Sequence, residues 1–355
     1  MNVHQILSGA GPVDAVTSQA RTMRRLMRDW GWGGVDVASS IDPRMGRAVR
    51  PLRALNPARS DVLLVHYSAY APKLERFLEL PNPKLLISHN VTPARWFWDV
   101  DPHLAIHCSL GRQRLPRFVQ AVDLAAGVSA FNAAELRQAG ARETTVIPIH
   151  FDPARLGACG PDRDPDPDHP PVILFVGRLT PHKRQDELIR AFALFRRHRS
   201  PQARLELVGE PVNEDYGAAL AALAEELAPG AVRFGRGLSD EALADRYRSA
   251  HVLCCLSEHE GFCIPLLEAF HFGVPVVARP AGGVPEVAGD AALLVPDRDP
   301  AVVAELLELA AGDAELRADL RTRGRARVAA YDPGATARAL RAAVERVAAA
   351  RNGCA

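Results

Sequence analysis

Apolar and polar positions along this chain follow two alternating patterns: short unbroken apolar runs, and longer segments with an apolar residue every third or fourth position. The first half contains the runs "VHQILSG", "VDVAS", "DVLLVHYS", "KLLISHN", "DLAAGVSA" and "TTVIPI". Such runs indicate buried strands. Between the first two, "TSQARTMRRLMRDW" indicates an amphipathic helix whose apolar stripe consists of Met23, Leu26, Met27 and Trp30.

The same alternation begins again after residue 171. The apolar runs there are "VILFVG", "RLELVG", "AVRFG", "HVLCCLS", "VPVVAR" and "AALLVP". After the first run, residues 180–198 predict a helix with Thr180 as N-cap and Pro181 in its first turn. Three helical segments close the chain. Strands that alternate with helices predict parallel sheets covered on both faces.

A Pro- and Asp-rich stretch, "GACGPDRDPDPDHPP", separates the two halves and cannot build a core. A chain of 355 residues is also too long for one ordinary core. The sequence therefore predicts an α/β protein with two doubly wound, Rossmann-like domains, residues 1–156 and 172–330, joined by a linker at 157–171. Ligands bind such sheets at the carboxyl ends of the strands, so a cleft between two facing domains is the expected site.

Composition and charge narrow the classes of function. Hydrophobic residues make up 48% of the chain, charged residues 24%, and the net charge is +1. This balance disfavours a nucleic-acid partner. No membrane-spanning run or signal-peptide pattern is present, and the six cysteines form no C-x-x-C pair, so we expect a cytoplasmic protein with reduced thiols. Cys254 and Cys255 lie in an apolar run and are expected to be buried.

The stretch "EHEGFCIPLLEAFHFGVPVVA" places carboxylates around a predicted helix start. Glu260 lies in the loop after a strand, and Glu268 lies about one turn inside the helix. Gly261 permits close approach to the backbone, and the N–H groups after it suit anionic or polar ligands. For Glu258, a favourable interaction with the helix dipole suffices as an explanation. For Glu260, this interaction and the binding of a ligand are both open interpretations. Glu268 in an apolar helix needs a partner.

A basic pair, Arg178 and Lys183, follows the first strand of the second half in "VGRLTPHKRQDELI". A guanidinium and an ammonium at a strand end suit a diphosphate, although a solvated basic loop is the usual fate of such charges. Arg184 is expected to be solvated.

These stretches resemble the retaining glycosyltransferases of family 4. "EGFCIPLLEAFHFGVPVVA" is similar to the family's E-x7-E signature, with Glu260 and Glu268 as its carboxylates, and "VGRLTPHKRQDELIRAF" is similar to its donor-binding segment. "AGGVPEVAGDAALLVP" resembles the segment that follows. The resemblance implies the GT-B fold, with the last helix, residues 331–355, crossing back toward the first domain. It implies retaining, metal-independent transfer of a hexose from a nucleotide diphosphate sugar, with no cofactor.

The resemblance also implies roles for individual residues. Arg178 and Lys183 hold the diphosphate and stabilise the charge of the leaving group. Glu260 binds sugar hydroxyls and Glu268 the ribose. The backbone around Gly261 contacts sugar and phosphates through Phe262, Cys263 and Ile264.

In the first half, the resemblance places His89 of "ISHN" beside the reacting centre, while an ordinary core histidine is the competing interpretation. Gly9 and Gly11 in "SGAGPVD" let the first loop approach the phosphates, as a loose match. A departure from the family is Cys263, where glycine is usual.

The acceptor is expected to be a glycan or a lipid-linked molecule in surface polysaccharide or glycoconjugate biosynthesis. Trp96, Phe97 and Trp98 suit stacking on a sugar, contact with lipid headgroups or plain packing. The first helix carries Arg21, Arg24, Arg25 and Arg28, which suits either peripheral contact with an anionic membrane or simple coverage of the sheet.

Two other functions are weighed against transfer. A sugar-nucleotide epimerase on the same fold needs residues that abstract a ring proton or eliminate the nucleotide, and no convincing set is present. A non-catalytic nucleotide-sugar-binding subunit is disfavoured because Arg178, Lys183, Glu260 and Glu268 occur together.

Overall fold

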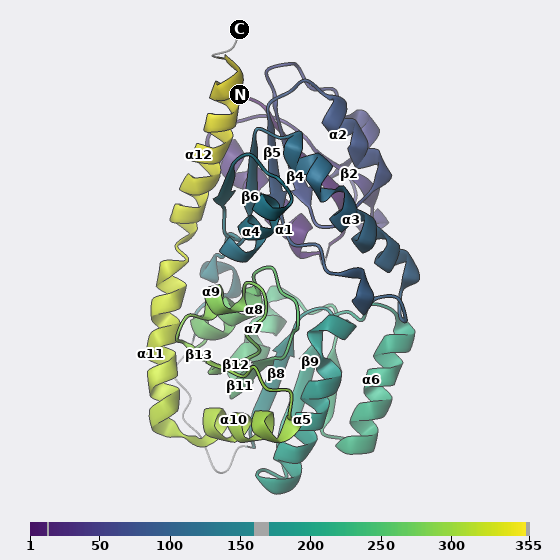
Figure 1. Ribbon diagram of the computed structural model, residues 1–355. Helices are drawn as coiled ribbons and strands as arrows, with labels where there is room; N and C mark the ends of the chain where they lie inside the picture. The colour runs from purple at the N-terminus through teal and green to yellow at the C-terminus, as the bar shows by residue number, and fades with distance from the viewer. Residues whose placement is uncertain (13, 160–169, 353–355) are drawn as a thin grey trace. The chain divides into compact units, whose positions relative to one another are not determined.

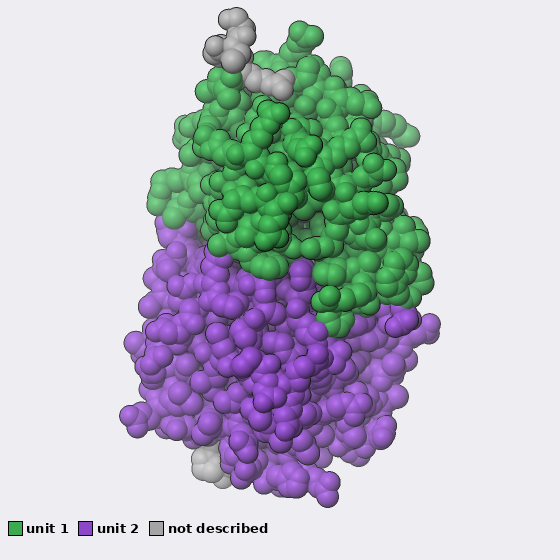
Figure 2. All heavy atoms as spheres, viewed as in Figure 1, with its two compact units in different colours: residues 1–98, 102–150, 333–355 green, residues 99–101, 151–332 purple. Residues whose placement is uncertain are grey.

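The computed structural model describes residues 1–12, 14–159 and 170–352, and these form two compact units (Figure 2). Unit 1 comprises residues 1–98, 102–150 and 333–355, and unit 2 comprises residues 99–101 and 151–332. Residues 151–156, predicted with the N-terminal domain, belong to unit 2 because the short 3-10 turn Pro153–Leu156 packs on helix α7 (Asp240–Ser249). Most of the predicted linker, residues 160–169, lies outside the described residues.

Unit 1 is built on a parallel sheet, whose seven described strands have the order β3–β2–β1–β4–β5–β6–β7 (Figure 1). The strands are β1 (Val3–Ala10), β2 (Asp36–Ile41), β3 (Arg50–Pro51), β4 (Val62–Tyr67), β5 (Lys84–Ser88), β6 (Leu124–Gly127) and β7 (Thr144–Val146). The helices are α1 (Ala15–Asp29), α2 (Glu75–Glu79), α3 (Pro102–Gln120), α4 (Ala130–Gln138) and α12 (Pro333–Asn352). The apolar runs predicted these strands except β3, whose two residues leave no periodic signal.

Helix α1 covers the sheet with a different stripe from the one predicted. Met23 and Met27 are buried, but Leu26 and Trp30 are only partly covered. Arg24 is 4% exposed and pairs with Asp36 of β2, so it does not belong to a basic surface that faces a membrane. None of the described helices has the length and apolarity that crossing a bilayer requires.

Unit 2 repeats the same winding. Its described strands form a six-stranded parallel sheet in the order β10–β9–β8–β11–β12–β13. They are β8 (Val172–Val176), β9 (Arg204–Val208), β10 (Val232–Gly235), β11 (Val252–Cys255), β12 (Val276–Ala278) and β13 (Ala292–Leu294). The helices are α5 (Gln185–His198), α6 (Glu214–Leu227), α7, α8 (Ile264–His271), α9 (Val284–Ala288), α10 (Pro300–Gly312) and α11 (Ala314–Ala330).

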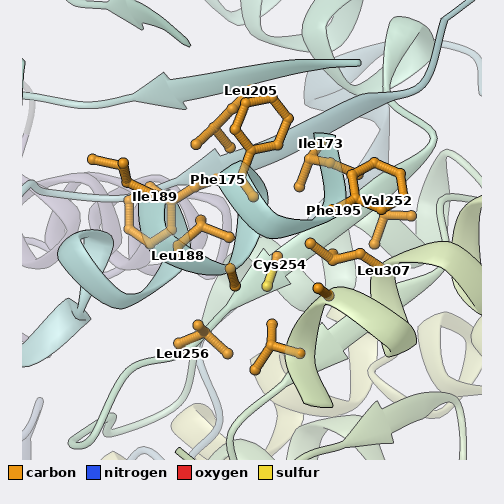
Figure 3. Packing of buried hydrophobic residues seen from close by; sticks show 14 of the residues in the cluster. Ile173, Phe175, Leu188, Ile189, Phe195, Leu205, Val252, Cys254, Leu256 and Leu307 are labelled. Atoms are coloured by element: carbon orange, nitrogen blue, oxygen red, sulfur yellow. The ribbon is translucent and has the colours of Figure 1, made fainter. Parts of the chain in front are cut away.

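The core of unit 2 lies between its sheet and the pair α5 and α10, which pack on each other (Figure 3). Phe175 comes from β8, Phe195 from α5, and Leu307 from α10. Helices α8, α9 and α11 pack on one another as a second group. Burying each of these large apolar side chains stabilises the packing of the helices on the sheet by about 1.5–3 kcal/mol.

The helix predicted over residues 180–198 is divided in two. Pro181–Lys183 form a 3-10 turn, Arg184 takes a left-handed conformation with φ 54°, and α5 begins at Gln185. Thr180 precedes the short turn and makes no side-chain cap bond. Lys183 therefore lies in the connection between β8 and α5 and not in α5 itself.

Both sheets reverse their strand order at one point, between β1 and β4 in unit 1 and between β8 and β11 in unit 2. Loops at such a switch point leave the sheet in opposite directions, and a crevice opens between them. The residues singled out in the sequence follow these strands: Gly9 and Gly11 lie at the end of β1, Lys183 follows β8, and Glu260 follows β11.

Candidate active site

The loops after β8 and β11 are joined at the switch point of unit 2. The backbone N–H of Glu258 donates to the carbonyl of His182 at 2.8 Å. Next to this bond, the ammonium of Lys183 forms an ion pair with Oε1 of Glu260. Glu260 is 6% exposed. The structure thus brings Lys183, which is predicted to bind the diphosphate, into direct contact with Glu260, which is predicted to bind the sugar.

The charge of Lys183 is stabilised by its surroundings. Burial alone lowers the pKa of a lysine, but the Glu260 carboxylate beside it outweighs burial and raises the pKa of Lys183 above its ordinary value. Lys183 is therefore a cation throughout the physiological pH range. A fixed cation in a site with little water interacts strongly with an anionic ligand.

The backbone of Glu260 is held by the turn before α9. Gly283 N–H donates to the Glu260 carbonyl at 2.9 Å. Gly282 has φ +59°, and a Cβ built there would lie 2.1 Å from the same carbonyl oxygen. Only glycine allows this approach, which explains the first glycine of the "GG" in the segment that follows the signature.

Cys263, the N-cap of α8, also has a left-handed backbone, with φ 77°. That region favours glycine, so a cysteine there carries a conformational cost. Its Sγ lies 3.7 Å from Sγ of Cys255, a buried residue that sequence reasoning did not assign to the site. The hydrogen bond with Cys255 and burial together raise the pKa of the Cys263 thiol well above its ordinary value.

Cys255, Glu260 and Cys263 offer three potential metal-ligand atoms within 4.8 Å of one another. Two thiols and a carboxylate are ligands that zinc accepts. The Lys183 ammonium, however, already pairs with Glu260 Oε1, so a divalent ion there has to compete with a resident cation. The cluster fits an ammonium–carboxylate pair flanked by thiols better than a metal site.

Glu268 lies inside α8, as predicted, and has two protein partners. Tyr247 donates to Oε2 at 2.7 Å, and Arg155 Nη2 donates to Oε1 at 2.9 Å. Burial raises the pKa of Glu268, and the two hydrogen bonds oppose this shift. These contacts satisfy a buried carboxylate without a ligand.

Sequence reasoning missed both partners of Glu268. Arg155 precedes the predicted linker and carried no motif, and Tyr247 lies on α7, where the pattern predicted only a helix.

The exposed Arg178 follows β8, and its carbonyl accepts from the side chain of Gln185 at 3.1 Å. Phe262 and Ile264 flank Cys263 at the start of α8, where backbone N–H groups have no partner within the helix.

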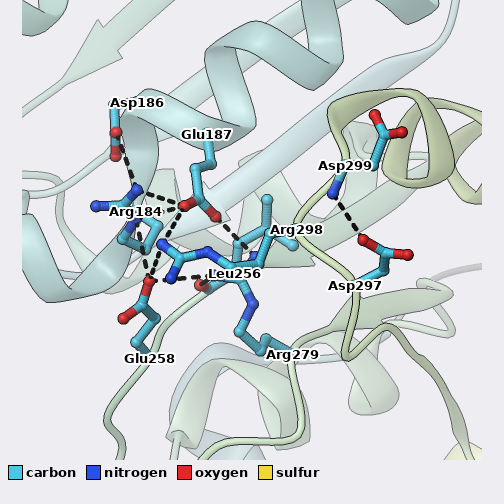
Figure 4. A network of polar contacts seen from close by, with 9 residues as sticks. All are labelled: Arg184, Asp186, Glu187, Leu256, Glu258, Arg279, Asp297, Arg298 and Asp299. Carbon is cyan, nitrogen blue, oxygen red and sulfur yellow. Dashed lines mark hydrogen bonds and ion pairs between the residues drawn. The ribbon is translucent and has the colours of Figure 1, made fainter.

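Glu258 belongs to a charge network rather than to the Lys183–Glu260 pair (Figure 4). Arg298 pairs with both Glu258 and Glu187, and Arg279 Nη2 contacts Glu187 Oε2 at 2.7 Å. Arg184, expected to be solvated, pairs with the same two glutamates. Burial raises the pKa of Glu187, but hydrogen bonds from the arginines outweigh it and lower the pKa to about 2. The network links the loop after β11 to the start of α5.

The remaining candidates lie in unit 1. His89 directly follows β5, and its Nε2 lies 2.8 Å from Nδ1 of His66, a fully buried residue of β4. Burial lowers the pKa of His89 to about 4. A Cβ on Gly9 or Gly11 would come no nearer than 3.9 Å to any atom, so neither glycine is required by the packing of the protein itself.

The aromatic residues of the segment after His89 differ in how much of each is exposed to solvent. Phe97 is 3% exposed and packs in the core of unit 1, whereas Trp98 is 48% exposed. The packing interpretation therefore holds for Phe97, and Trp98 is the one that faces solvent.

Solved structures define the class of fold. The chain is similar to the Anabaena protein HepE, solved in complex with UDP and glucose, with a TM-score of 0.77 and 17% identity over 98% of this chain and 100% of that one. It is similar to sucrose-phosphate synthase from Thermosynechococcus elongatus, with a TM-score of 0.75 and 19% identity over 99% and 100% of the two chains. The fold is that of the GT-B proteins, as the sequence predicted.

Sequence comparisons relate unit 2 to known glycosyltransferases. Residues 162–327 match the family model described as "Glycosyl transferases group 1". D-inositol 3-phosphate glycosyltransferase from Frankia alni is 37% identical over 196 residues, which are 53% of this chain and 47% of that protein. MMP alpha-(1->4)-mannosyltransferase from Mycolicibacterium hassiacum is 36% identical over 118 residues, 33% of this chain and 28% of that protein. The matches span about half the length of these curated relatives or less, and the segment that matches the family model lies in unit 2.

Proposed function

We propose that this protein is a retaining glycosyltransferase of family 4 that transfers a hexose from a nucleotide diphosphate sugar to a hydroxyl group of an acceptor. The observation that carries the proposal is the buried Lys183–Glu260 pair at the switch point of unit 2. It lies within the segment that matches the group 1 family, and Glu268 follows Glu260 after seven residues.

In the proposed reaction, the bond between the anomeric carbon and the diphosphate oxygen breaks, and the acceptor oxygen bonds to the same carbon. The acceptor proton passes to the departing diphosphate. Lys183 and Arg178 stabilise the negative charge that develops on the leaving group. Removing one such preorganised donor from an enzyme costs about 10²–10³ in rate.

Glu260 accepts hydrogen bonds from sugar hydroxyls, since an ionised carboxylate accepts and does not donate. The N–H groups of Phe262, Cys263 and Ile264 contact sugar and phosphates, and Glu268 accepts from the ribose. In unit 1, His89 contacts the sugar, while Gly9 and Gly11 leave room for a ligand near the end of β1.

The names of the relatives support a hexose donor. One is a mannosyltransferase, and the Anabaena protein HepE was solved with UDP-glucose as well as with UDP and glucose. We propose a glycan or lipid-linked acceptor in surface polysaccharide or glycoconjugate biosynthesis. The reaction takes place in the cytoplasm, without a metal ion or another cofactor, and the exposed Trp98 is the residue of this region that suits peripheral contact with a membrane.

The test is a transfer assay with UDP-, GDP-, ADP- and TDP-hexoses, offered with and without glycan and lipid-linked acceptors, in the presence of a chelator. Mass spectrometry detects the product, and the proton coupling at its anomeric carbon gives the configuration. Lys183→Ala is run beside Arg190→Ala, which removes an exposed cation from α5.

Acceptor-dependent transfer with a retained configuration, abolished only by Lys183→Ala, is the expected result. An inverted product contradicts the retaining mechanism, and loss of activity on chelation contradicts the metal-free one. Conversion of the donor sugar without an acceptor indicates an epimerase instead. Nucleotide binding without any turnover indicates a non-catalytic subunit.

A further inference from the structure

A continuous series of hydrogen-bonded side chains crosses the sheet of unit 1 and ends at His89. It starts on α1 with Arg24, passes through Asp36 of β2 and Gln5 of β1, and reaches His66 of β4. Gln5 and His66 are 0% exposed and Arg24 is 4% exposed. The proposed function uses His89 but leaves these buried polar groups without a role.

The first contacts fix the orientation of the Gln5 amide. Its Nε2 donates to Asp36 Oδ1 at 2.8 Å and to the carbonyl of Ala20 at 2.9 Å. Both partners are acceptors, so this end of the amide has to be the NH₂ group. Arg24 holds Asp36 in place through Nε at 3.0 Å and Nη2 at 2.7 Å, and Oε1 of Gln5 therefore points to His66.

The orientation of Gln5 sets the tautomer of His66. Gln5 Oε1 only accepts, and it lies 2.8 Å from His66 Nε2, so His66 carries a proton on Nε2. A second proton on Nδ1 makes an imidazolium, which the buried position and the Arg24 charge disfavour. Burial, the neighbouring His89 and Arg24 all lower the pKa of His66 well below its ordinary value. Nδ1 of His66 is therefore an acceptor.

His66 in turn sets the tautomer of His89. His66 Nδ1 and His89 Nε2 are 2.8 Å apart, and the two rings stack with centroids 5.1 Å apart. Because His66 Nδ1 accepts, the proton between them belongs to His89 Nε2. None of the residues that the structure describes hydrogen-bonds to His89 Nδ1, and the side chain is only partly buried.

We propose that Arg24, Asp36, Gln5 and His66 hold His89 as the neutral imidazole protonated on Nε2, so that Nδ1 is presented as a hydrogen-bond acceptor for a hydroxyl group of the ligand. Gln5 and His66 are positioning residues and do not touch the ligand. An acceptor nitrogen selects a ligand group that donates, which is a hydroxyl and not a phosphate. The identification of this hydroxyl as one of the transferred sugar rests on the proposed function.

The direct test measures the tautomer itself. Long-range ¹H–¹⁵N correlation spectra of the ¹⁵N-labelled protein at neutral pH distinguish protonated from unprotonated ring nitrogens, and a His89→Gln variant assigns the His89 signals. The expected result is a single state with a protonated Nε2 and an unprotonated Nδ1. A protonated Nδ1 on His89, or a doubly protonated ring at neutral pH, overturns the proposal.

Variants then separate positioning from mere structural support. His66→Phe removes the acceptor, while His66→Asn keeps an amide oxygen near the position of Nδ1. The matched control is His4→Phe. It removes a buried histidine that lies on β1, outside the series, and whose Nε2 is 3.1 Å from Asp61 Oδ2. His66→Phe should give a mixture of both His89 tautomers, and His66→Asn and His4→Phe should keep the Nε2–H form.

Kinetics of the same variants complete the test. His66→Phe should lower kcat about tenfold, because the hydrogen bond between His89 Nδ1 and the ligand hydroxyl is lost, and KM for the donor should not change. His66→Asn should restore most of the lost kcat. An unchanged His89 tautomer in folded His66→Phe overturns the inference. If no donor supports transfer by the wild type, the proposed function fails, whereas the tautomer is still decided by the spectra.

Discussion

At the scale of single residues, Lys183 and Glu260 come from different loops and meet in one ion pair. The left-handed Arg184 ends the 3-10 turn that contains Lys183, and α5 begins one residue later. In the proposed function, the pair supplies a cation for the charge that develops on the leaving diphosphate and a carboxylate for the sugar.

Lys183→Ala should reduce transfer about 10²–10³-fold, because the variant loses a preorganised cation and leaves Glu260 without its partner. The measurement is kcat/KM with the preferred donor, together with circular dichroism to show that the fold is kept. Arg190→Ala should behave like the wild type. Near-normal transfer by Lys183→Ala would show that the diphosphate is bound elsewhere.

Glu187 makes stability depend on pH in a defined window. Its folded pKa of about 2 is below its ordinary value of 4.5, so its contribution to stability is complete above about pH 4.5 and is lost as the pH falls toward 2. Glu187→Gln should be less stable than the wild type at pH 7, and the difference should shrink on acidification. Urea unfolding at pH 7 and near pH 3 measures it, with the exposed Glu241→Gln as control. A constant difference would contradict the assignment.

At the scale of elements, the turn between β12 and α9 supports the loop that carries Glu260. Gly282 touches the Glu260 carbonyl, and Gly283 donates to it. The first glycine is therefore required by close contact, and this segment supports the backbone of Glu260.

Gly282→Ala should be destabilised by about 3 kcal/mol and should lose most of its activity, because the new Cβ displaces the Glu260 backbone. Gly230→Ala is the matched control: its φ of +64° is similar, but nothing lies within 4 Å of its Cβ position. The control should cost only about 1 kcal/mol and keep its activity. Chemical denaturation compares the two, and equal losses would contradict the role of the contact.

The alternating apolar runs predicted both sheets. The resemblance to the family predicted that the loops after β8 and β11 carry the site, and this remains a prediction. Contacts between distant segments could not be predicted. Arg155 reaches Glu268 across 113 positions of sequence, and Gln5 reaches His66 across 61. Such pairs depend on strand order and register, which no local pattern encodes. The split at Arg184 was missed because a non-glycine residue in the left-handed region has no sequence signal.

At the scale of the whole molecule, the chain consists of two units that each have a sheet and a core of their own, and its last helix belongs to the first unit. Helix α12 lies against β4 and β5, and its Val344 is 0% exposed. Unit 1 therefore includes a helix that is distant in sequence from its other elements.

Val344→Asp should destabilise unit 1 by about 4 kcal/mol, because it buries an unpaired charge. Unit 2 should keep its own stability. Calorimetric unfolding should show one transition moving to lower temperature and the other unmoved, with the exposed Ala342→Asp as control. A parallel shift of every transition would mean that the two units do not unfold separately.

The central claim is that unit 2 binds the diphosphate of a nucleotide sugar at Lys183 and Arg178. Calorimetric titration of the wild type, Lys183→Ala, Arg178→Ala and Arg190→Ala with UDP, GDP, ADP and TDP tests it most directly. The account predicts binding of one nucleotide in preference to the others, weakened about tenfold or more by the first two substitutions and unchanged by the third. Equal binding by all four proteins, or no binding by the folded wild type, would contradict it.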